Sequence, residues 1–247
     1  MHQRRWKAAA NNILPKRQPT RINDTMKPYI SIVIPTLNEQ DNMHTLLKGI
    51  HSVIKDYRYE VIIVDGHSQD KTAKFALQMG ASIMYDDTGK GSALRKGLNA
   101  AKGKIIISMD ADLSHRPNEL KLLIAGIEAG YDICMGSRFL TGGGSDDMPL
   151  IRIMGNKIFV SIVNLLYGSH YTDMCYGYRS FANGVSKKLN LVEDGFGIET
   201  EISIKAQKRH LRALEVPSYE KLRESGEGKL RSIGDGYIIL KTILKNL

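Results

Sequence analysis

Short apolar runs rich in β-branched residues alternate with helical patterns from residue 29 onward, and this alternation constrains the fold of the chain most strongly. The predicted strands are Tyr29–Ile34, Glu60–Val64, Ser82–Tyr85, Lys104–Met109, Asp132–Gly136 and Ala213–Val216. The predicted helices between them are Glu39–Lys55, Lys71–Met79, Ser92–Ala101 and Pro117–Ala129. Strands separated by helices of this length are joined by right-handed crossovers. The sequence therefore predicts an α/β fold with a mostly parallel sheet flanked by helices.

The positive charge of the chain is concentrated in its first 27 residues. The 247 residues carry a formal net charge of +9. Segment 1–27 holds seven Lys and Arg residues against one Asp, which is most of that excess. We expect this segment to be a flexible basic extension, with a polybasic contact to anionic lipid or phosphate as the alternative. Residues 28–247 then form a single domain, and a hydrophobic content of 42% is enough to give it a core.

Composition excludes several classes of protein. Cys134 and Cys175 form no CxxC pair, so neither a disulfide framework nor a zinc ribbon is expected. The N-terminal segment lacks the apolar stretch of a signal peptide, and no unbroken apolar run is long enough to predict a membrane span. The body also lacks basic stripes interleaved with aromatic residues, so nucleic acid is not an expected partner. We therefore expect a reduced, cytoplasmic protein.

Acidic residues follow three predicted strands, in segments 35–39, 65–70 and 110–115. In parallel sheets the loops after the strands meet at one edge and bind ligands there. Helix capping is an alternative for Asn38 and Asp70. It does not explain Asp110 and Asp112, because two carboxylates one residue apart repel each other unless a cation lies between them. Mg²⁺ and Mn²⁺ prefer oxygen ligands, so the sequence predicts a divalent metal site here.

Familiar nucleotide-binding loops are absent from the sequence. There is no GxxxxGK[ST] motif and no GxGxxG after the first strand, which excludes a P-loop enzyme and the dinucleotide fingerprint. Gly89-Lys90-Gly91 precedes a predicted helix. This tripeptide is interpreted either as a simple turn or as a site that brings a lysine and backbone amides to a phosphate.

Five segments carry a resemblance to a known family: SIVIPTLNE (31–39), EVIIVDGHSQDKT (60–72), GKGSALRKGL (89–98), MDADLSHRP (109–117) and GSRF (136–139). Together they resemble the inverting glycosyltransferases of family 2, which have the GT-A fold. The likeness is greatest to dolichol-phosphate mannosyltransferases and related polyprenyl-phosphate hexosyltransferases. It implies a Rossmann-like sheet and a metal-dependent transfer of a hexose, mannose or glucose, with inversion. The donor would be GDP-mannose or UDP-glucose, and the acceptor a polyprenyl (dolichyl) phosphate.

The resemblance also implies roles for individual residues at the donor end. Those that would bind the nucleotide sugar are Pro35, Leu37, Glu39, Val64, Asp65 and Ala111. Asp110 and Asp112 would be the catalytic carboxylates and would hold Mg²⁺ or Mn²⁺, with Ser114 as a third ligand. Leu37 and Gly66 depart from the family pattern, which has an aromatic residue and a second acid at these positions. The donor nucleotide therefore stays open.

At the acceptor end, the resemblance implies that four cations hold the lipid phosphate: Arg138, Arg152, Arg223 and Lys229. A phosphate monoester is ionised near neutral pH and needs no general base. A hydroxyl acceptor on a glycan or small molecule would need one, and Asp173 occupies the family position for it. A third hypothesis is a non-enzymatic binder that depends on the basic N-terminal segment. It would keep its activity without Asp110 and Asp112.

Three further side chains have alternative interpretations. We expect His115 to make a local hydrogen bond in its loop rather than to act as a base or ligand. Glu199 and Glu201 lie on a helix with apolar neighbours. They either orient the site or pair with Lys205 and Lys208.

Two apolar stretches bear on localisation. Ile158–Tyr167 is expected to pack in the core, whereas Ile238–Leu247 suits a membrane interface as well as it suits the core. To reach a polyprenyl phosphate, the protein would need a membrane-protein partner or peripheral contact with the membrane. We therefore expect it at the cytoplasmic membrane face.

Overall fold

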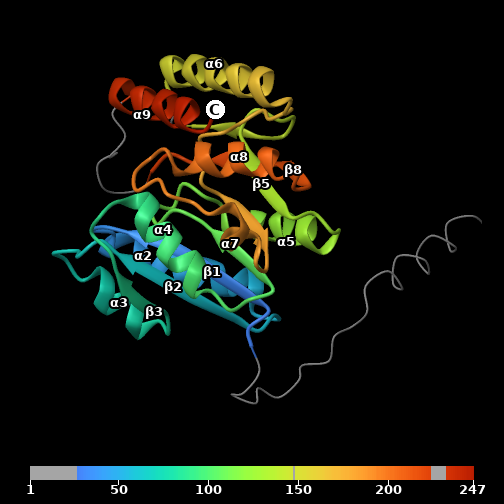
Figure 1. The fold of residues 1–247 in the computed structure, drawn as a ribbon. Coiled ribbons are helices and arrows are strands. Elements are labelled where there is room, and N and C mark those ends of the chain that lie inside the picture. Colours follow the sequence, from blue (N-terminus) through green and yellow to red (C-terminus); the bar gives the residue numbers. More distant parts are fainter. Residues whose placement is uncertain (1–26, 147, 224–231) are drawn as a thin grey trace, which may run out of the picture.

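The computed structural model describes residues 27–146, 148–223 and 232–247. Its main sheet has the strand order β3-β2-β1-β4-β7-β5-β8 (Figure 1). The strands are β1 (Ile30–Thr36), β2 (Tyr59–Asp65), β3 (Ser82–Tyr85), β4 (Ile105–Ser108), β5 (Ile133–Ser137), β7 (Arg179–Ala182) and β8 (Ala213–Pro217). All neighbours are parallel except β7, which runs antiparallel to β4 and β5. A second, two-stranded sheet pairs β6 (Gly144–Ser145) with β9 (Tyr219–Glu220).

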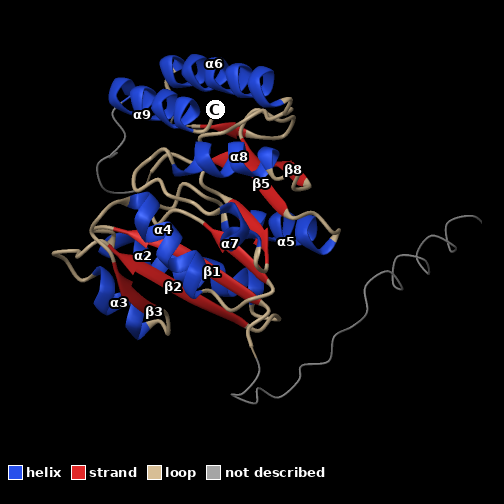
Figure 2. Ribbon diagram, viewed as in Figure 1, coloured by secondary structure: helices blue, strands red, loops and turns tan. Residues whose placement is uncertain are grey.

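Helices cover both faces of the sheet (Figure 2). On one face lie α2 (Gln40–Ile54), α3 (Thr72–Gln78), η1 (Pro117–Glu119) and α5 (Leu120–Glu128). On the other lie α4 (Lys90–Ala100), α7 (Val185–Leu189) and α8 (Ile198–Lys208). Two further helices, α6 (Leu150–Tyr167) and α9 (Ser232–Lys245), pack against each other and against α8 at one end of the molecule (Figure 1).

The core is divided between the two faces of the sheet, as the alternation of side chains along a strand requires. In β1, Ile30, Ile32 and Ile34 join the cluster formed with α2 and α5, whereas Val33 joins the cluster under α4 and α8. Because both faces are covered, β1 and β4 are nearly continuous apolar runs. The predicted α/β architecture is confirmed.

All six predicted strands and all four predicted helices are present, with ends shifted by no more than a few residues. The central antiparallel strand β7 is not among the predicted elements. Its sequence begins with Arg179, which is buried, and its guanidinium donates to the carbonyl oxygens of Tyr176 and Met174 and to the Ser203 hydroxyl. A strand that buries an arginine does not show the apolar pattern by which strands are predicted.

The prediction that Ile158–Tyr167 packs in the core is confirmed for one face only, where Val160 and Val163 are buried in the cluster under α4 and α8. This stretch is the second half of α6, and Leu165 on it is 85% exposed. Within the described residues, α6 is also long and apolar enough by length and composition to cross a membrane, with 17% of it buried. The expectation that no segment is long and apolar enough to span a membrane is thus corrected. Polar residues such as Arg152 and Asn156 interrupt the apolar run without making the helix polar on average.

Candidate active site

A cavity of about 450 Å³ opens at the edge of the sheet where β1 and β4 end. Its lining comes from the loops after these strands, from the first turn of α4, and from α6, α8 and α9. One wall is polar and carries Asp110 and Asp112. Another is apolar and is formed by Met148, Ile151, Phe159, Phe196 and Ile239. The cavity therefore joins an acidic site at the sheet edge to an apolar passage between helices.

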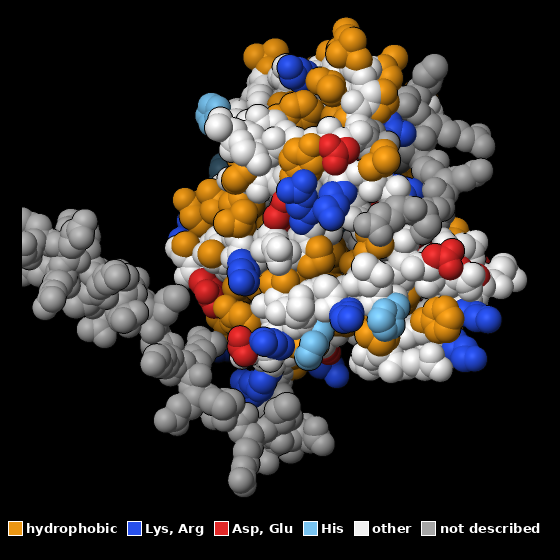
Figure 3. Space-filling model, turned by 180° about the vertical axis from the view of Figure 1, so that it is seen from behind, with side chains coloured by type: hydrophobic (Ala, Val, Ile, Leu, Met, Phe, Trp, Pro, Cys, Tyr) orange, Lys and Arg blue, Asp and Glu red, His pale blue; other side chains and the backbone are white. Residues whose placement is uncertain are grey.

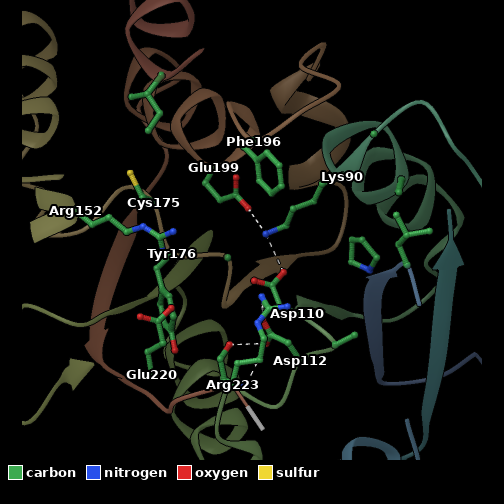
Figure 4. A pocket seen from close by; sticks show the side chains of 18 of the residues that line it. Lys90, Asp110, Asp112, Arg152, Cys175, Tyr176, Phe196, Glu199, Glu220 and Arg223 are labelled. Carbon is green, nitrogen blue, oxygen red and sulfur yellow. Dashed lines mark hydrogen bonds and ion pairs between the residues drawn. The ribbon is translucent and has the colours of Figure 1, made fainter. Parts of the chain in front are cut away.

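The carboxylates of Asp110 and Asp112 each contact a cation of the protein (Figure 4). Lys90 Nζ lies 2.9 Å from Asp110 Oδ1, and Arg223 Nη2 lies 2.6 Å from Asp112 Oδ2. Burial is the largest single influence on the Asp110 carboxyl and would raise its pKa, but the charges of Lys90, His115 and Arg223 and the hydrogen bond from Lys90 together lower this pKa to about 2. Asp110 is therefore ionised throughout the physiological pH range.

The loop that carries these two acids is held by local hydrogen bonds. Leu113 has a left-handed backbone (φ 64°), and this turn lets the Ser114 hydroxyl donate to Asp112 Oδ1 at 2.6 Å. The Asp110 N–H donates to His115 Nδ1 at 3.0 Å. The His115 ring stacks on Tyr178, with 4.6 Å between ring centroids. The prediction of a local hydrogen bond for His115 is confirmed.

The two glutamates of α8 have different surroundings. Glu199 lines the cavity, and its Oε1 lies 3.0 Å from Lys90 Nζ. Glu201 accepts hydrogen bonds from the backbone N–H groups of Val192 and Glu193 and pairs with Lys205 at 2.6 Å. Of the two interpretations, pairing with Lys205 therefore applies to Glu201, and a place in the site applies to Glu199.

Of the residues predicted to bind the nucleotide sugar at the donor end, the structure brings Pro35, Leu37, Glu39 and Ala111 to the cavity wall. Gly66 lies there too, and a Cβ on it would lie 3.5 Å from Leu37 Cδ1. The two unusual residues of this end are thus neighbours in space.

Val64 and Asp65 lie behind this wall. Val64 is fully buried, and the Asp65 carboxylate accepts hydrogen bonds from the Ser68 N–H and hydroxyl at 2.7 Å each. Within the part of the chain that the structure describes, neither residue lines the cavity. Asp65 positions the loop beside the site, and its nucleotide-binding role stays a prediction.

Asn38 and Asp70 join two loops beside the site. Asn38 Oδ1 accepts from the Gln69 N–H, so it does not cap α2. Asp70 accepts from the N–H groups of Thr72 and Gln40, the first residues of α3 and α2. Asp70 is thus not the N-cap residue of α3, which is Lys71, but its carboxylate binds the first N–H group of both helices.

The four predicted acceptor cations differ in their surroundings. Arg138 lines the cavity, but its guanidinium is already bound: Nε lies 2.7 Å from Asp173 Oδ2, and Nη1 lies 3.1 Å from Glu220 Oε2. Arg152 extends from α6 into the cavity (Figure 4). Arg223 also lines it, whereas Lys229 lies outside the described residues, as does most of segment 1–27.

Sequence reasoning missed many of the lining residues, among them Asn156, Tyr176 and Glu220. Asn156 lies four residues after Arg152 on the same face of α6, and this helical spacing is a signal that would find it. Tyr176 and Glu220 approach Arg138 from separate segments, and nothing local in the sequence marks them.

The oxygen ligands in this cavity fit a divalent cation that is also bound by a phosphate-bearing substrate. Four carboxylates surround two cations here: Asp110 and Glu199 flank Lys90, and Asp112 and Glu39 flank Arg223. The cluster thus keeps an excess of negative charge. Among the described residues, no group of three or more His, Cys, Asp or Glu side chains is arranged to hold a metal alone. Magnesium typically takes only one or two protein carboxylates and completes its shell with phosphates and water.

A family model describes most of this fold and the acidic loop. The match to the model "Glycosyl transferase family 2" covers residues 31–189. The chain belongs to glycosyl transferase family 2. Its cavity, with paired aspartates after β4, lies where the loops of such a sheet meet.

Curated relatives of this family 2 chain include enzymes of polyprenyl phosphates. It is 31% identical to the dolichol-phosphate mannosyltransferase of Pyrococcus furiosus over 210 residues, which are 82% of this chain and 59% of that protein. It is 26% identical to the polyprenol monophosphomannose synthase of Mycolicibacterium smegmatis, over 86% of this chain and 84% of that one. The chain thus spans less than two thirds of the Pyrococcus protein.

Solved structures support the fold. Glucosyl-3-phosphoglycerate synthase from Mycobacterium tuberculosis, crystallised with Mn²⁺, UDP and glucosyl-3-phosphoglycerate, superimposes with a TM-score of 0.69 and 20% identity. The match covers 89% of this chain and 80% of that one. The predicted GT-A fold is confirmed.

Proposed function

We propose that this protein transfers a hexose from a nucleotide-diphosphate sugar to a polyprenyl phosphate, with inversion and with the help of a divalent metal. The observation that carries the proposal is the composition of the cavity. Paired aspartates lie at the sheet edge, Arg152 extends into the cavity, and the apolar wall continues between α6 and α9. A ligand with a charged head and an apolar tail would place its head beside Arg152 and its tail along the apolar wall.

The proposed metal is Mg²⁺ or Mn²⁺, and Asp110 and Asp112 would hold it, with the Ser114 hydroxyl beside them. When bound, it neutralises the charge on the diphosphate leaving group. The chain's own residues fix this site through the bonds of Ser114 and His115 to the acidic loop. Lys90, with His115 and Arg223, also keeps Asp110 ionised.

The proposed donor is GDP-mannose or UDP-glucose. Pro35, Leu37, Glu39 and Ala111 would contact its nucleoside, since they form the cavity wall beyond the aspartates. Val64 and Asp65 would act from behind that wall. Carboxylates accept hydrogen bonds from ribose hydroxyls and base N–H groups, which suits Glu39.

A phosphate acceptor agrees with the surroundings of the acids better than a hydroxyl acceptor does. Asp173 would be the base for a hydroxyl, but it is fully buried, and both its oxygens accept hydrogen bonds from Arg138. It does not line the described cavity. An ionised phosphate needs no such base, and Arg152 can bind its oxygens bidentately. Attack from the face opposite the diphosphate inverts the anomeric carbon.

Replacing Arg152 by alanine is expected to raise the KM for polyprenyl phosphate about 10- to 100-fold, because one charge-assisted contact contributes about 1.5–3 kcal/mol. The KM for the donor should stay unchanged. Initial rates in detergent micelles, with each substrate varied in turn, measure both constants. Lys157→Ala is the matched control, since Lys157 is an exposed cation on the same helix. Equal acceptor KM values for Arg152→Ala and wild type would contradict the proposed acceptor site.

We also propose that α6 and α9 hold the protein at the cytoplasmic face of the membrane without a membrane-protein partner. Exposed apolar side chains on them are Leu150, Ile151, Met154, Ile158, Leu165, Leu166, Tyr237, Leu240 and Leu244. Figure 3 shows hydrophobic side chains at this end of the molecule, interspersed with Lys and Arg. Because α6 also supplies Arg152 and Asn156 to the cavity, lying in the interface fits it better than spanning the bilayer.

The full chain is therefore expected to float with vesicles that contain anionic lipid. Leu165→Glu should reduce the bound fraction several-fold, since it puts a charge on the most exposed apolar position of α6. Leu77→Glu is the control, because Leu77 is an exposed leucine on α3, on the other side of the sheet. Wild-type protein that stays with the soluble fraction, or equal effects of the two substitutions, would contradict membrane docking by α6.

A further inference from the structure

The tripeptide Gly89-Lys90-Gly91 packs closely against the backbone of residues 193–195. Gly91 and Ser92 donate their N–H groups to the carbonyl oxygen of Asp194, at 2.7 and 3.1 Å. A Cβ on Gly91 would lie 2.5 Å from the carbonyl oxygen of Glu193, so only glycine permits this approach. These two amides of α4 are therefore satisfied by protein and are not directed at a phosphate. This backbone contact fixes the start of α4 against the segment that leads into α8.

This docking brings two charged side chains of distant segments together. Lys90 is the first residue of α4, and Glu199 lies in the first turn of α8. The Lys90 ammonium lies 3.0 Å from Glu199 and 2.9 Å from Asp110 (Figure 4). Gly177 leaves the space between the two acids open, since a Cβ there would lie 3.4 Å from an oxygen of each.

Glu199 contacts the acidic site mainly through this lysine. Its side chain is almost fully buried, and Glu199 Oε1 has no hydrogen-bond partner in the described residues apart from its ion pair with Lys90. Among the described residues, Lys90 is the only cation within ion-pair distance of this buried carboxylate, so Glu199 depends on it. Lys90 pairs with both Asp110 and Glu199. A divalent cation bound to Asp110 would compete with Lys90 for that carboxylate.

We propose that Glu199 is a positioning residue that sets the metal affinity of the site by drawing Lys90 away from Asp110. This inference rests on the proposed metal-dependent function and adds a residue to it. With Glu199 charged, Lys90 keeps an anionic partner when a divalent cation takes Asp110. With Glu199 neutral, Lys90 has Asp110 alone, and the cation must displace it.

The test measures Mn²⁺ binding to the full chain without donor or acceptor, by the loss of the free Mn²⁺ signal in electron paramagnetic resonance. Glu199→Gln should weaken binding at least about threefold, and Lys90→Met should strengthen it by a similar factor, because it removes the competing cation. In the double variant, Glu199→Gln should change Mn²⁺ affinity little further, since the lysine through which Glu199 acts has been removed. The double variant also avoids a buried, uncompensated Glu199, which keeps the test valid if Lys90→Met alone fails to fold.

Glu201→Gln is the matched control, since Glu201 is as buried as Glu199, lies on the same helix and pairs with Lys205 instead. It should lower the melting temperature and leave Mn²⁺ affinity unchanged. If Glu199→Gln weakens binding equally with and without Lys90, Glu199 acts on the metal directly and the inference is wrong. It is also wrong if Lys90→Met weakens Mn²⁺ binding. Because no acceptor is present, a protein that shows this coupling yet fails to use polyprenyl phosphate would overturn only the proposed function.

Discussion

Replacing Asp112 by asparagine should lower the rate of hexose transfer at least about a thousandfold, which corresponds to about 4 kcal/mol of transition-state stabilisation. Asparagine keeps the size of the side chain but removes the charge that would hold the metal beside the leaving diphosphate. It also weakens the hold on Arg223, whose Nη2 lies 2.6 Å from Asp112 Oδ2. Initial rates at saturating donor, acceptor and Mn²⁺ measure the effect.

The matched control for this change is Asp41→Asn, because Asp41 is an exposed acid in the first turn of α2. Its rate should equal that of wild type. If Asp112→Asn is folded and keeps more than ~10% of the wild-type rate, less than about 1.4 kcal/mol has been lost. The proposed metal role of Asp112 would then be wrong.

Replacing Asp173 by asparagine should mainly cost stability, by about 3–5 kcal/mol, because it removes one partner of a buried ion pair. Asp173 is fully buried, and its oxygens accept from Arg138 Nε at 2.7 Å and Nη2 at 3.0 Å. For a chain of this length, such a loss lowers the melting temperature by roughly 10 °C. Thermal unfolding measures this, and transfer to polyprenyl phosphate is measured well below the new melting temperature.

The remaining activity of Asp173→Asn distinguishes its two interpretations. If Asp173 only positions Arg138, the folded variant should keep kcat for polyprenyl phosphate within about tenfold, with a higher acceptor KM. Loss of all transfer at normal stability would instead identify Asp173 as a base and favour a hydroxyl acceptor. Asp132→Asn is the control, since Asp132 pairs with Arg212 at the surface, and such pairs contribute little to stability.

Much of the fold is predictable from the sequence because its signals are local. The apolar runs of β1 and β4 and the helices between strands follow from spacing alone. The antiparallel strand β7 does not, since its buried Arg179 is compensated by groups that only the folded chain assembles. The exposure of α6 is also not readable locally, because an apolar helix has the same composition whether it faces a core, a partner or a membrane.

The site, like the fold, has parts that the sequence predicts and parts that it does not. Asp110 and Asp112 are predictable because they follow a buried strand directly, and their mutual repulsion points to a cation. The partner of each charge is not predictable. Arg138 meets Asp173 and Glu220, and Lys90 meets Glu199, across long separations in sequence. Two glutamates two residues apart on α8 thus have unrelated surroundings.

The most direct test of the proposed function is whether nucleotide release depends on lipid. The full chain is incubated with Mn²⁺ and either GDP-mannose or UDP-glucose, with and without a short polyprenyl phosphate, and free nucleoside diphosphate is measured. We predict release from one of the two donors that rises with the lipid and matches the amount of lipid-linked hexose formed. Release that does not respond to the lipid, or transfer only to a hydroxyl acceptor, would contradict it.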